Sequence, residues 1–329
     1  MTDPVPHWPG RLVSLAGGQR VYVAQTPGTV RNNDNGLVLC VHGMSGAATN
    51  WTDFLAELAP DFNGIAVDLP GSGHSPPPKR PSGYSVKALA GTVTRLIEAL
   101  GAGPVHLVGN SMGGAVCIRA AASRPDLVRT LTLISPALPD RVSGPLLYEF
   151  ALAALPVAGV RIMRHTQRLS PENRVASVIA TCFYDAGAVH PERFALEVAE
   201  LTRRDQLRYA PVTLSRAART IVLEYLRPRR FSLWRAAERV PVPALVVFGS
   251  HDKLVNPRLA APAARAFRNA DVVVLQRTGH VAQMEHPGLV AARFREMVAR
   301  ARLSRGATHG SPGMPDDETR LTPDEVPST

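Results

Sequence analysis

Residues 105–124 read VHLVGNSMGGAVCIRAAASR, an apolar strand pattern that leads through a glycine-rich turn into a helix pattern. Gly109, Ser111 and Gly113 form a Gly-x-Ser-x-Gly motif at this turn. So sharp a step from strand to helix strains the serine backbone and pushes its hydroxyl outward, and side chains at positions 109 and 113 would collide with the turn. The motif predicts Ser111 as a nucleophile supported by Gly109 and Gly113. The alternative is a glycine-rich turn with an incidental serine.

An acyl-transfer reaction at Ser111 needs N–H donors for the oxyanion that develops on the substrate. We expect the Met112 N–H to be one donor, because it lies at the positive end of the helix dipole. The second is expected from the loop HGMSG, where Gly43 lets the chain bend so that the Met44 N–H faces the serine. We interpret His42 as a structural residue that supports this turn. A simple glycine-rich loop is the alternative.

Serine is a weak nucleophile until a base removes its proton. Among ten histidines, His280 in TGHVAQMEHP follows the last apolar strand pattern and is expected at the same sheet edge as Ser111. Asp252, in GSHDKLVNP, also follows a strand pattern and is expected to orient the imidazole and to stabilise its charged form. Asp140 is the alternative carboxylate. We interpret Asp68 as a residue that stabilises the turn PGSG.

Strand and helix patterns alternate along most of the chain. Strands are predicted at 11–16 and 19–25 (a hairpin), 37–42, 64–70, 105–110, 129–135, 243–250 and 272–276, and helices at 51–59, 85–101, 112–124, 258–267 and 288–303. This alternation predicts an α/β fold, with a parallel sheet covered by helices on both faces. Residues 140–238 contain helical patterns without a convincing strand, so they are predicted to be a helical insertion.

The predicted core therefore comprises residues 1–139 and 239–303, interrupted by the insertion at 140–238. Residues 304–329 are rich in Gly, Pro, Asp and Thr and are predicted to be a disordered tail. The whole chain of 329 residues is 45% hydrophobic and 19% charged. This is a globular composition, which excludes a collagen, a coiled coil or a wholly disordered protein.

The net charge of the chain is +10, and all but three of its 37 basic residues are arginines. Residues 141–240 hold 16 arginines against nine acidic residues, so the insertion carries much of this charge. An anionic partner would suit such a surface. Because no nucleic-acid recognition motif accompanies the charge, we predict no specific nucleic-acid partner and interpret most arginines as solvated.

The three cysteines, Cys40, Cys117 and Cys182, are scattered, which excludes a disulfide framework and a Cys-rich zinc site. The N-terminal sequence MTDPVPHWPG has no apolar run and does not read as a signal peptide. The stretch closest to a membrane span, 146–160, contains a glutamate and a proline. Together these features predict a cytoplasmic protein without a membrane-spanning helix.

The motifs described above, together with DLPGSGHS at 68–75, resemble those of the α/β-hydrolase fold superfamily over about residues 10–300. The order Ser111, Asp252, His280 matches the nucleophile–acid–base order of that family. The resemblance implies a mostly parallel eight-stranded sheet with helices on both faces, and it implies that the insertion is a lid over the cleft.

Finer resemblances point to particular branches of the superfamily. A serine at position 111 argues against the epoxide-hydrolase and haloalkane-dehalogenase branches, which use an aspartate there. The segments GNSMGG and GHVAQMEHP also resemble the meta-cleavage-product hydrolases, which cleave a carbon–carbon bond. Met44 and Ser45 depart from the usual oxyanion loop of that branch, and none of the insertion arginines can be assigned to its substrate-binding arginine.

We therefore predict a serine hydrolase of carboxylic esters, similar to carboxylesterases and lipases, that needs no cofactor and no metal. The apolar segment 150–160 could line an acyl pocket or touch a membrane, so the expected partners are an ester or lipid-like small molecule and, peripherally, a membrane. The chain is expected to be a monomer or a homodimer. The alternatives are a carbon–carbon bond hydrolase and a non-catalytic member of the fold that binds a ligand.

Overall fold

The computed structural model describes residues 5–27, 35–140 and 151–309. A single eight-stranded sheet runs through them in the order β1-β2-β4-β3-β5-β6-β7-β8. Strand β2 is antiparallel to β1 and β4, and every other neighbouring pair is parallel. The strands are β1 (Gly10–Ser14), β2 (Arg20–Gln25), β3 (Leu37–Val41), β4 (Asn63–Val67), β5 (Val105–Asn110), β6 (Val128–Ile134), β7 (Ala244–Gly249) and β8 (Ala270–Leu275). The predicted mostly parallel, eight-stranded sheet is confirmed.

The sequence explains the difference between the edge and the centre of the sheet. Strands β3 and β7 are continuous apolar runs, and β5 adds only His106 and Asn110 to such a run. Every residue in these three strands is buried, as expected of strands covered on both faces. The β1–β2 hairpin turns at Gly17 and Gly18, whose positive φ angles of 87° and 74° favour glycine. Buried residues alternate with more accessible ones in β2, and β1 is exposed except at Val13, because this edge of the sheet meets solvent.

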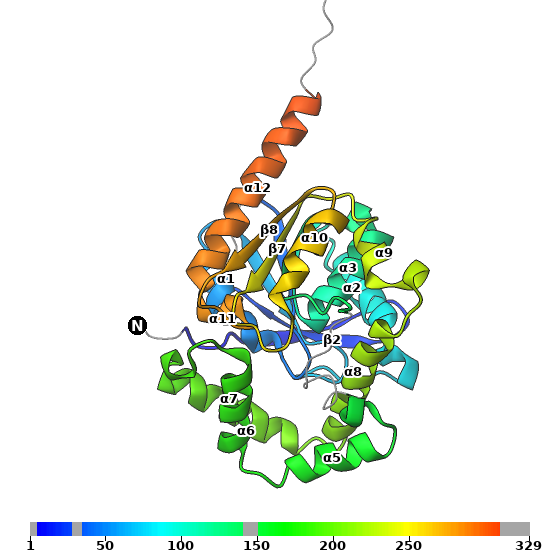
Figure 1. Ribbon diagram of the computed structural model, residues 1–329, viewed down its shortest axis with the longest axis vertical. Coiled ribbons are helices and arrows are strands. Elements are labelled where there is room, and N and C mark those ends of the chain that lie inside the picture. The colour runs from blue at the N-terminus through cyan, green and yellow to red at the C-terminus, as the bar shows by residue number, and fades with distance from the viewer. Residues whose placement is uncertain (1–4, 28–34, 141–150, 310–329) are drawn as a thin grey trace, which may run out of the picture.

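Helices cover both faces of the sheet (Figure 1). On one face α2 (Val86–Leu100), α3 (Met112–Ser123), α9 (Leu233–Ala237) and α10 (Ala260–Ala266) contribute to the larger apolar core. On the other face α1 (Thr52–Leu58) and α12 (Pro287–His309) pack through Phe54 and Phe294, whose ring centroids are 6.2 Å apart. The predicted two-faced coverage is therefore observed.

Helix boundaries follow local signals at some ends but not at others. Ser85 caps α2, accepting a hydrogen bond from the Ala88 N–H, and Gly101 ends the helix with a φ of 62°. By contrast, α12 continues past residue 303, where its end was predicted, to His309. The added residues include alanine and arginine, which favour helix, so the predicted boundary was placed too early. The predicted tail from 310 onwards lies outside the described residues.

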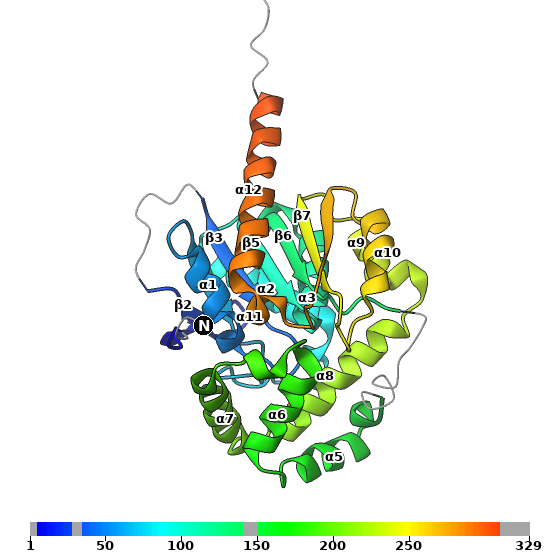
Figure 2. The ribbon, with the colours of Figure 1, turned by 60° about the vertical axis from the view of Figure 1, so that its left-hand side comes forward.

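The chain between β6 and β7 forms the helical insertion, of which residues 151–238 are described. It contains α5 (Ala158–Thr166), α6 (Pro171–Cys182), α7 (Pro191–Asp205) and α8 (Ala210–Tyr225), followed by α9. In this described stretch no strand occurs. Helices α5 to α8 gather at one end of the molecule, opposite the free end of α12 (Figure 2). No helix in the described ranges combines the length and the apolar character needed to cross a bilayer.

Candidate active site

Ser111 lies at the turn between β5 and α3, where the sequence predicted a nucleophile. Its φ of 54° and ψ of −118° place it in a region that non-glycine residues rarely adopt. A Cβ at Gly109 would lie 2.6 Å from the Gly113 carbonyl oxygen, and one at Gly113 would lie 2.2 Å from the Val41 carbonyl oxygen. Only glycine fits at either position, so the close packing of the turn is what holds Ser111 in its strained conformation.

His280 and Asp252 meet at the carboxyl end of the sheet. The Asp252 carboxylate follows β7, His280 follows β8, and His280 Nδ1 lies 2.9 Å from Asp252 Oδ2. Both side chains are almost fully buried. The second carboxylate oxygen accepts hydrogen bonds from the N–H groups of Leu254 and Val255 at 2.8 and 2.9 Å. Asp252, rather than the alternative Asp140, is thus the carboxylate bound to His280.

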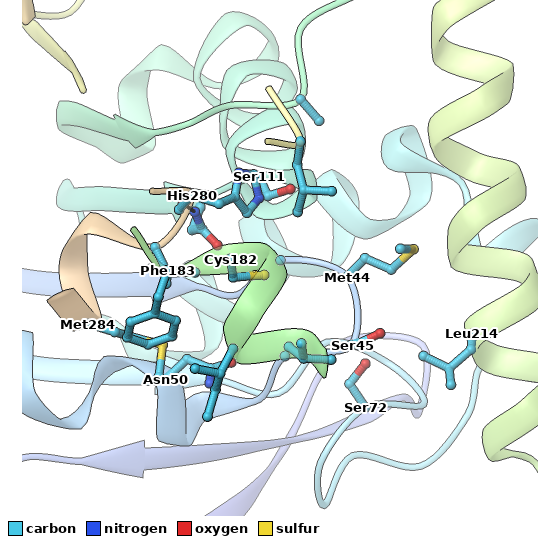
Figure 3. Close-up of a pocket in the computed structure, with 18 of the residues that line it drawn as sticks. Met44, Ser45, Asn50, Ser72, Ser111, Cys182, Phe183, Leu214, His280 and Met284 are labelled. Atoms are coloured by element: carbon cyan, nitrogen blue, oxygen red, sulfur yellow. Dashed lines mark hydrogen bonds between the residues drawn. The ribbon is translucent and has the colours of Figure 1, made fainter. Parts of the chain in front are cut away.

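The electrostatics of this pair fix the tautomer of the imidazole. Burial alone would raise the pKa of Asp252, but the nearby His280 and the N–H of Val255 hold the pKa of this carboxyl below its ordinary value. An ionised carboxylate can only accept, so His280 Nδ1 donates to it. In neutral His280 this leaves Nε2 as the proton acceptor. Figure 3 draws Ser111 beside His280, and both line the same pocket.

The loop after β3 packs directly on the serine turn. A Cβ at Gly43 would lie 3.1 Å from the Ser111 Cβ, so the backbone that leads into Met44 passes next to the serine. His42 holds this loop: its Nδ1 donates to the Gly43 carbonyl at 2.7 Å, and its Nε2 accepts from the Leu69 N–H at 3.0 Å. Burial lowers the pKa of His42 to about 4, which keeps the ring neutral. These two hydrogen bonds are those that a supporting role for His42 would require, and that role stays a prediction.

Met112, whose N–H is the other predicted oxyanion donor beside that of Met44, is the first residue of α3. The first N–H groups of an α-helix have no carbonyl partner within the helix, so the Met112 N–H is available beside Ser111. Asp68 has the turn role assigned to it: its two oxygens accept from the N–H groups of Ala48 and His74, both at 2.7 Å.

These groups open onto one large pocket of about 600 Å³ between the sheet and the helical insertion. Ser111, His280, Asp252 and Met44 contribute to its wall. Much of the remainder is apolar and comes from the insertion: Val175, Val178, Ile179, Phe183, Val189, Leu201, Leu207, Leu214 and Ile221. Figure 3 shows Leu214 on α8 across the cavity from His280. Such a lining suits a substrate with an apolar part.

Comparison with known proteins agrees with this architecture. A family model described as the alpha/beta hydrolase fold matches residues 36–287. The chain belongs to this family. It is 28% identical over 313 residues to a 2-hydroxy-6-oxononadienedioate/2-hydroxy-6-oxononatrienedioate hydrolase of Burkholderia vietnamiensis, an alignment that covers 91% of this chain and 98% of the relative.

Two solved structures share the fold of this hydrolase. A thermophilic esterase from Thermogutta terrifontis is 24% identical with a TM-score of 0.63, and the match covers 89% of this chain and 99% of the esterase. A 2-hydroxy-6-oxo-6-phenylhexa-2,4-dienoate hydrolase from Rhodococcus sp. strain RHA1 is 22% identical with a TM-score of 0.65, over 88% of this chain and all of that one. At these identities the likeness concerns the fold.

Three arginines of the insertion line the pocket of the hydrolase: Arg174, Arg193 and Arg204. The sequence alone could not distinguish these three from the other arginines of the insertion. Each binds a protein acceptor. Arg174 pairs with Asp205 at 2.5 Å, and Arg193 pairs with Asp53. Arg204 donates to the Ser45 carbonyl at 2.6 Å, which ties α7 to the loop that carries Met44. Carboxylates and a backbone carbonyl of the protein itself thus bind the guanidinium groups that these arginines bring to the pocket.

Two further polar side chains, to which the sequence gave no role, connect the parts of the site. Asn110 Nδ2 donates to the main-chain carbonyl of His280 at 3.0 Å. Glu285 accepts from the Gly279 N–H at 2.7 Å with one oxygen and from the Tyr184 N–H, in the insertion, at 2.9 Å with the other. The only signal in the sequence was their position inside GNSMGG and GHVAQMEHP.

The His280 loop also contacts the insertion through its backbone. The His280 N–H donates to the Cys182 carbonyl at the end of α6, at 2.6 Å. A Cβ at Gly279 would lie 2.3 Å from the same carbonyl oxygen, so glycine is required for this approach. Within the described residues, no three His, Cys, Asp or Glu side chains are grouped so that they could hold a metal ion.

Proposed function

We propose that this protein hydrolyses carboxylic esters with an apolar acyl group, through a covalent acyl-enzyme on Ser111. The observation that carries the proposal is the 2.9 Å contact of His280 Nδ1 with Asp252, at a pocket that also holds the strained Ser111. A neutral imidazole that donates through Nδ1 presents Nε2 as a base toward the serine. This is the arrangement that general-base activation of a hydroxyl requires.

In the proposed first step, Ser111 Oγ attacks the ester carbonyl carbon while its proton passes to His280 Nε2. The negative charge that develops on the carbonyl oxygen is stabilised by the N–H groups of Met44 and Met112. The carbon–oxygen bond to the alcohol then breaks, and His280 returns the proton to the leaving alkoxide. Asp252 stays ionised throughout and stabilises the imidazolium.

In the second step, water attacks the acyl-enzyme and gives its proton to His280. The tetrahedral intermediate collapses, Ser111 leaves with that proton, and the carboxylic acid is released. We propose that the helical insertion acts as a lid, because its apolar residues face Ser111 across the pocket. Closing such a lid excludes water from the acyl group until the acyl-enzyme has formed.

Carbon–carbon bond cleavage is the second candidate, and the similarity to the Burkholderia vietnamiensis enzyme favours it. By its name, the substrate of that enzyme is a dicarboxylate, which calls for exposed cationic groups in the pocket. Here Arg174 and Arg193 are already paired with carboxylates, and Arg204 is bound to a backbone carbonyl. This internal pairing supports an uncharged ester in preference to a dicarboxylate.

A substrate panel separates the two candidates. We expect p-nitrophenyl esters to be hydrolysed, with kcat/KM rising from acetyl to longer acyl groups as the apolar pocket fills. We expect a 2-hydroxy-6-oxodienoate to be turned over far more slowly. Faster cleavage of the dienoate than of every ester would assign the carbon–carbon reaction instead.

A further inference from the structure

The outer surface of the helical insertion exposes an unusual number of large apolar side chains. In the described residues, ten of the fourteen exposed large apolar side chains belong to the insertion. Five of them fall within one short segment and are 37–64% exposed: Leu152, Leu155, Val157, Ile162 and Leu169. Isolated exposed apolar residues are common on soluble proteins, but such a cluster marks a surface that contacts an apolar partner.

Arginines lie between these apolar residues. Arg161, Arg164 and Arg168 are exposed, and none of the ion pairs found among the described residues includes them. The sequence contains no acidic residue between positions 150 and 171. The three arginines and the five apolar residues together form what we call the α5 face. It is apolar and positively charged at once.

The α5 face is held outward by the packing of its helix. Gly159 is the buried residue of α5, and a Cβ there would lie 2.0 Å from the Ala153 carbonyl oxygen and 2.8 Å from Ser215 Oγ on α8. This close approach turns the Gly159 side of α5 inward and leaves Arg161, two residues further along the helix, on the opposite, exposed side. Figure 1 and Figure 2 place α5 at the end of the molecule farthest from α12.

We propose that the α5 face docks on a lipid bilayer that contains anionic lipids. Apolar side chains insert at the boundary between headgroups and acyl chains, and arginines bind the anionic headgroups, which is the pattern of interfacial amphipathic helices. A second copy of this chain fits poorly, because pairing two α5 faces would bring six unpaired guanidinium groups together. The acidic residues after position 310 follow α12, which ends at the opposite side of the molecule.

Docking would bring the membrane next to the pocket. Gln167, which caps the C-terminal end of α5, lines that pocket and donates to Asp205 at 3.2 Å. A bilayer bound by the α5 face would therefore lie beside the insertion helices through which an apolar substrate would enter. The docking itself does not rest on the proposed ester hydrolysis, because it needs neither Ser111 nor His280.

The test is co-sedimentation of the full chain with vesicles of phosphatidylcholine alone or mixed with phosphatidylglycerol. We expect binding to the mixed vesicles that weakens as salt is added. Replacing Arg161, Arg164 and Arg168 with glutamine should weaken binding about a hundredfold, since each arginine near an anionic surface contributes about fivefold. Replacing Leu155 and Ile162 with serine should weaken it about tenfold or more.

Matched controls separate this surface from the overall charge. Changing the exposed Arg11, Arg20 and Arg265 to glutamine removes the same charge elsewhere, and Leu12→Ser removes an exposed apolar side chain of β1. Both controls should bind as the wild type does, and circular dichroism should show every variant folded. Absence of binding to the mixed vesicles, or equal weakening by the control triple, would overturn the proposal. Carrying Ser111→Ala in each chain keeps the outcome independent of catalysis.

Discussion

The side-chain amide of Asn110 donates to the main-chain carbonyl of His280 at 3.0 Å, across 170 positions of sequence. The same amide donates to the Ile134 carbonyl at 3.1 Å. The residue that precedes the proposed nucleophile therefore holds the loop that carries the proposed base. Because Asn110 is buried, no solvent can replace these bonds. The distance between Ser111 and His280 thus depends on a group that itself takes no part in proton transfer.

Asn110→Ala should lower kcat about tenfold to a hundredfold while changing KM little. The substitution leaves the buried His280 carbonyl without its donor, which costs about 1–3 kcal/mol, and it frees the His280 loop. The Ile134 carbonyl still accepts from the Ser111 N–H at 3.0 Å. Steady-state kinetics on a p-nitrophenyl ester and urea unfolding measure the two effects. Asn269→Ala, at an exposed position, is the control. An unchanged kcat would show that Asn110 does not position His280.

Glu285 should act as a positioning residue, because its carboxylate joins Gly279 in the His280 loop to Tyr184 in the insertion. Glu285→Ala removes both acceptors, and we expect kcat/KM to fall about tenfold, the scale of a small misplacement of a catalytic group. Glu285→Gln keeps one acceptor oxygen, so its kcat/KM should lie between those of Glu285→Ala and the wild type. Glu296→Ala, an exposed glutamate on α12, is the matched control and should behave as the wild type does. Equal activity of all three variants would refute the role.

The turn at Ser111 should not tolerate even one added methyl group. A Cβ at Gly113 would lie 2.2 Å from a backbone oxygen of β3, so Gly113→Ala should destabilise the fold by about 3 kcal/mol or more and abolish activity. Gly288→Ala is the control, because the nearest atom to its Cβ would be 3.7 Å away and alanine favours helix. Urea unfolding of both variants gives the comparison. A Gly113→Ala protein as stable as Gly288→Ala would contradict the packing described.

Much of the site could be predicted from the sequence because its signals are local. Ser111, Asp252 and His280 each follow an apolar strand pattern within a few residues, and parallel strands end at a common edge. The glycines at 109 and 113 indicate close packing, because a turn of this kind leaves no room for a side chain at either position. These features need no knowledge of distant residues.

The connections between those segments could not be predicted, since they join polar residues in loops far apart in the chain. Glu285 and Tyr184 are 101 positions apart, and neither lies in a periodic pattern that would predict a contact. The pocket arginines were equally hidden: Arg174, Arg193 and Arg204 differ from the other insertion arginines only in their three-dimensional neighbours. The segment 150–160 was expected to line a pocket or touch a membrane. In its described part, residues 151–154 are helical, and a turn at residues 155–157 separates them from α5, which begins at Ala158.

Acid should weaken the fold through His42. Its folded pKa of about 4 lies below the ordinary value of 6.5, so between these values the unfolded chain takes up a proton that the folded protein does not. The contribution of His42 to the free energy of unfolding is therefore fully present above pH 6.5. It falls as the pH is lowered to about 4, by about 1.4 kcal/mol per pH unit.

Urea unfolding at several pH values measures this slope. In His42→Gln the contribution is absent, so the free energy of unfolding should depend less steeply on pH between 6.5 and 4, although the variant is less stable at neutral pH. His165→Gln, at an exposed histidine on α5, should keep the slope of the wild type. Identical slopes in all three proteins would exclude His42 as the source.

The most direct test of the central claim is covalent labelling of Ser111 by a fluorophosphonate, followed by peptide mass spectrometry. We expect one adduct on the peptide that contains Ser111, slower labelling in His280→Gln, and none in Ser111→Ala, with ester hydrolysis reduced by at least about 10⁴-fold in the last. Ser72→Ala removes another hydroxyl of the same pocket and should still be labelled at Ser111. An adduct on a different residue, or hydrolysis by Ser111→Ala at the wild-type rate, would contradict the account.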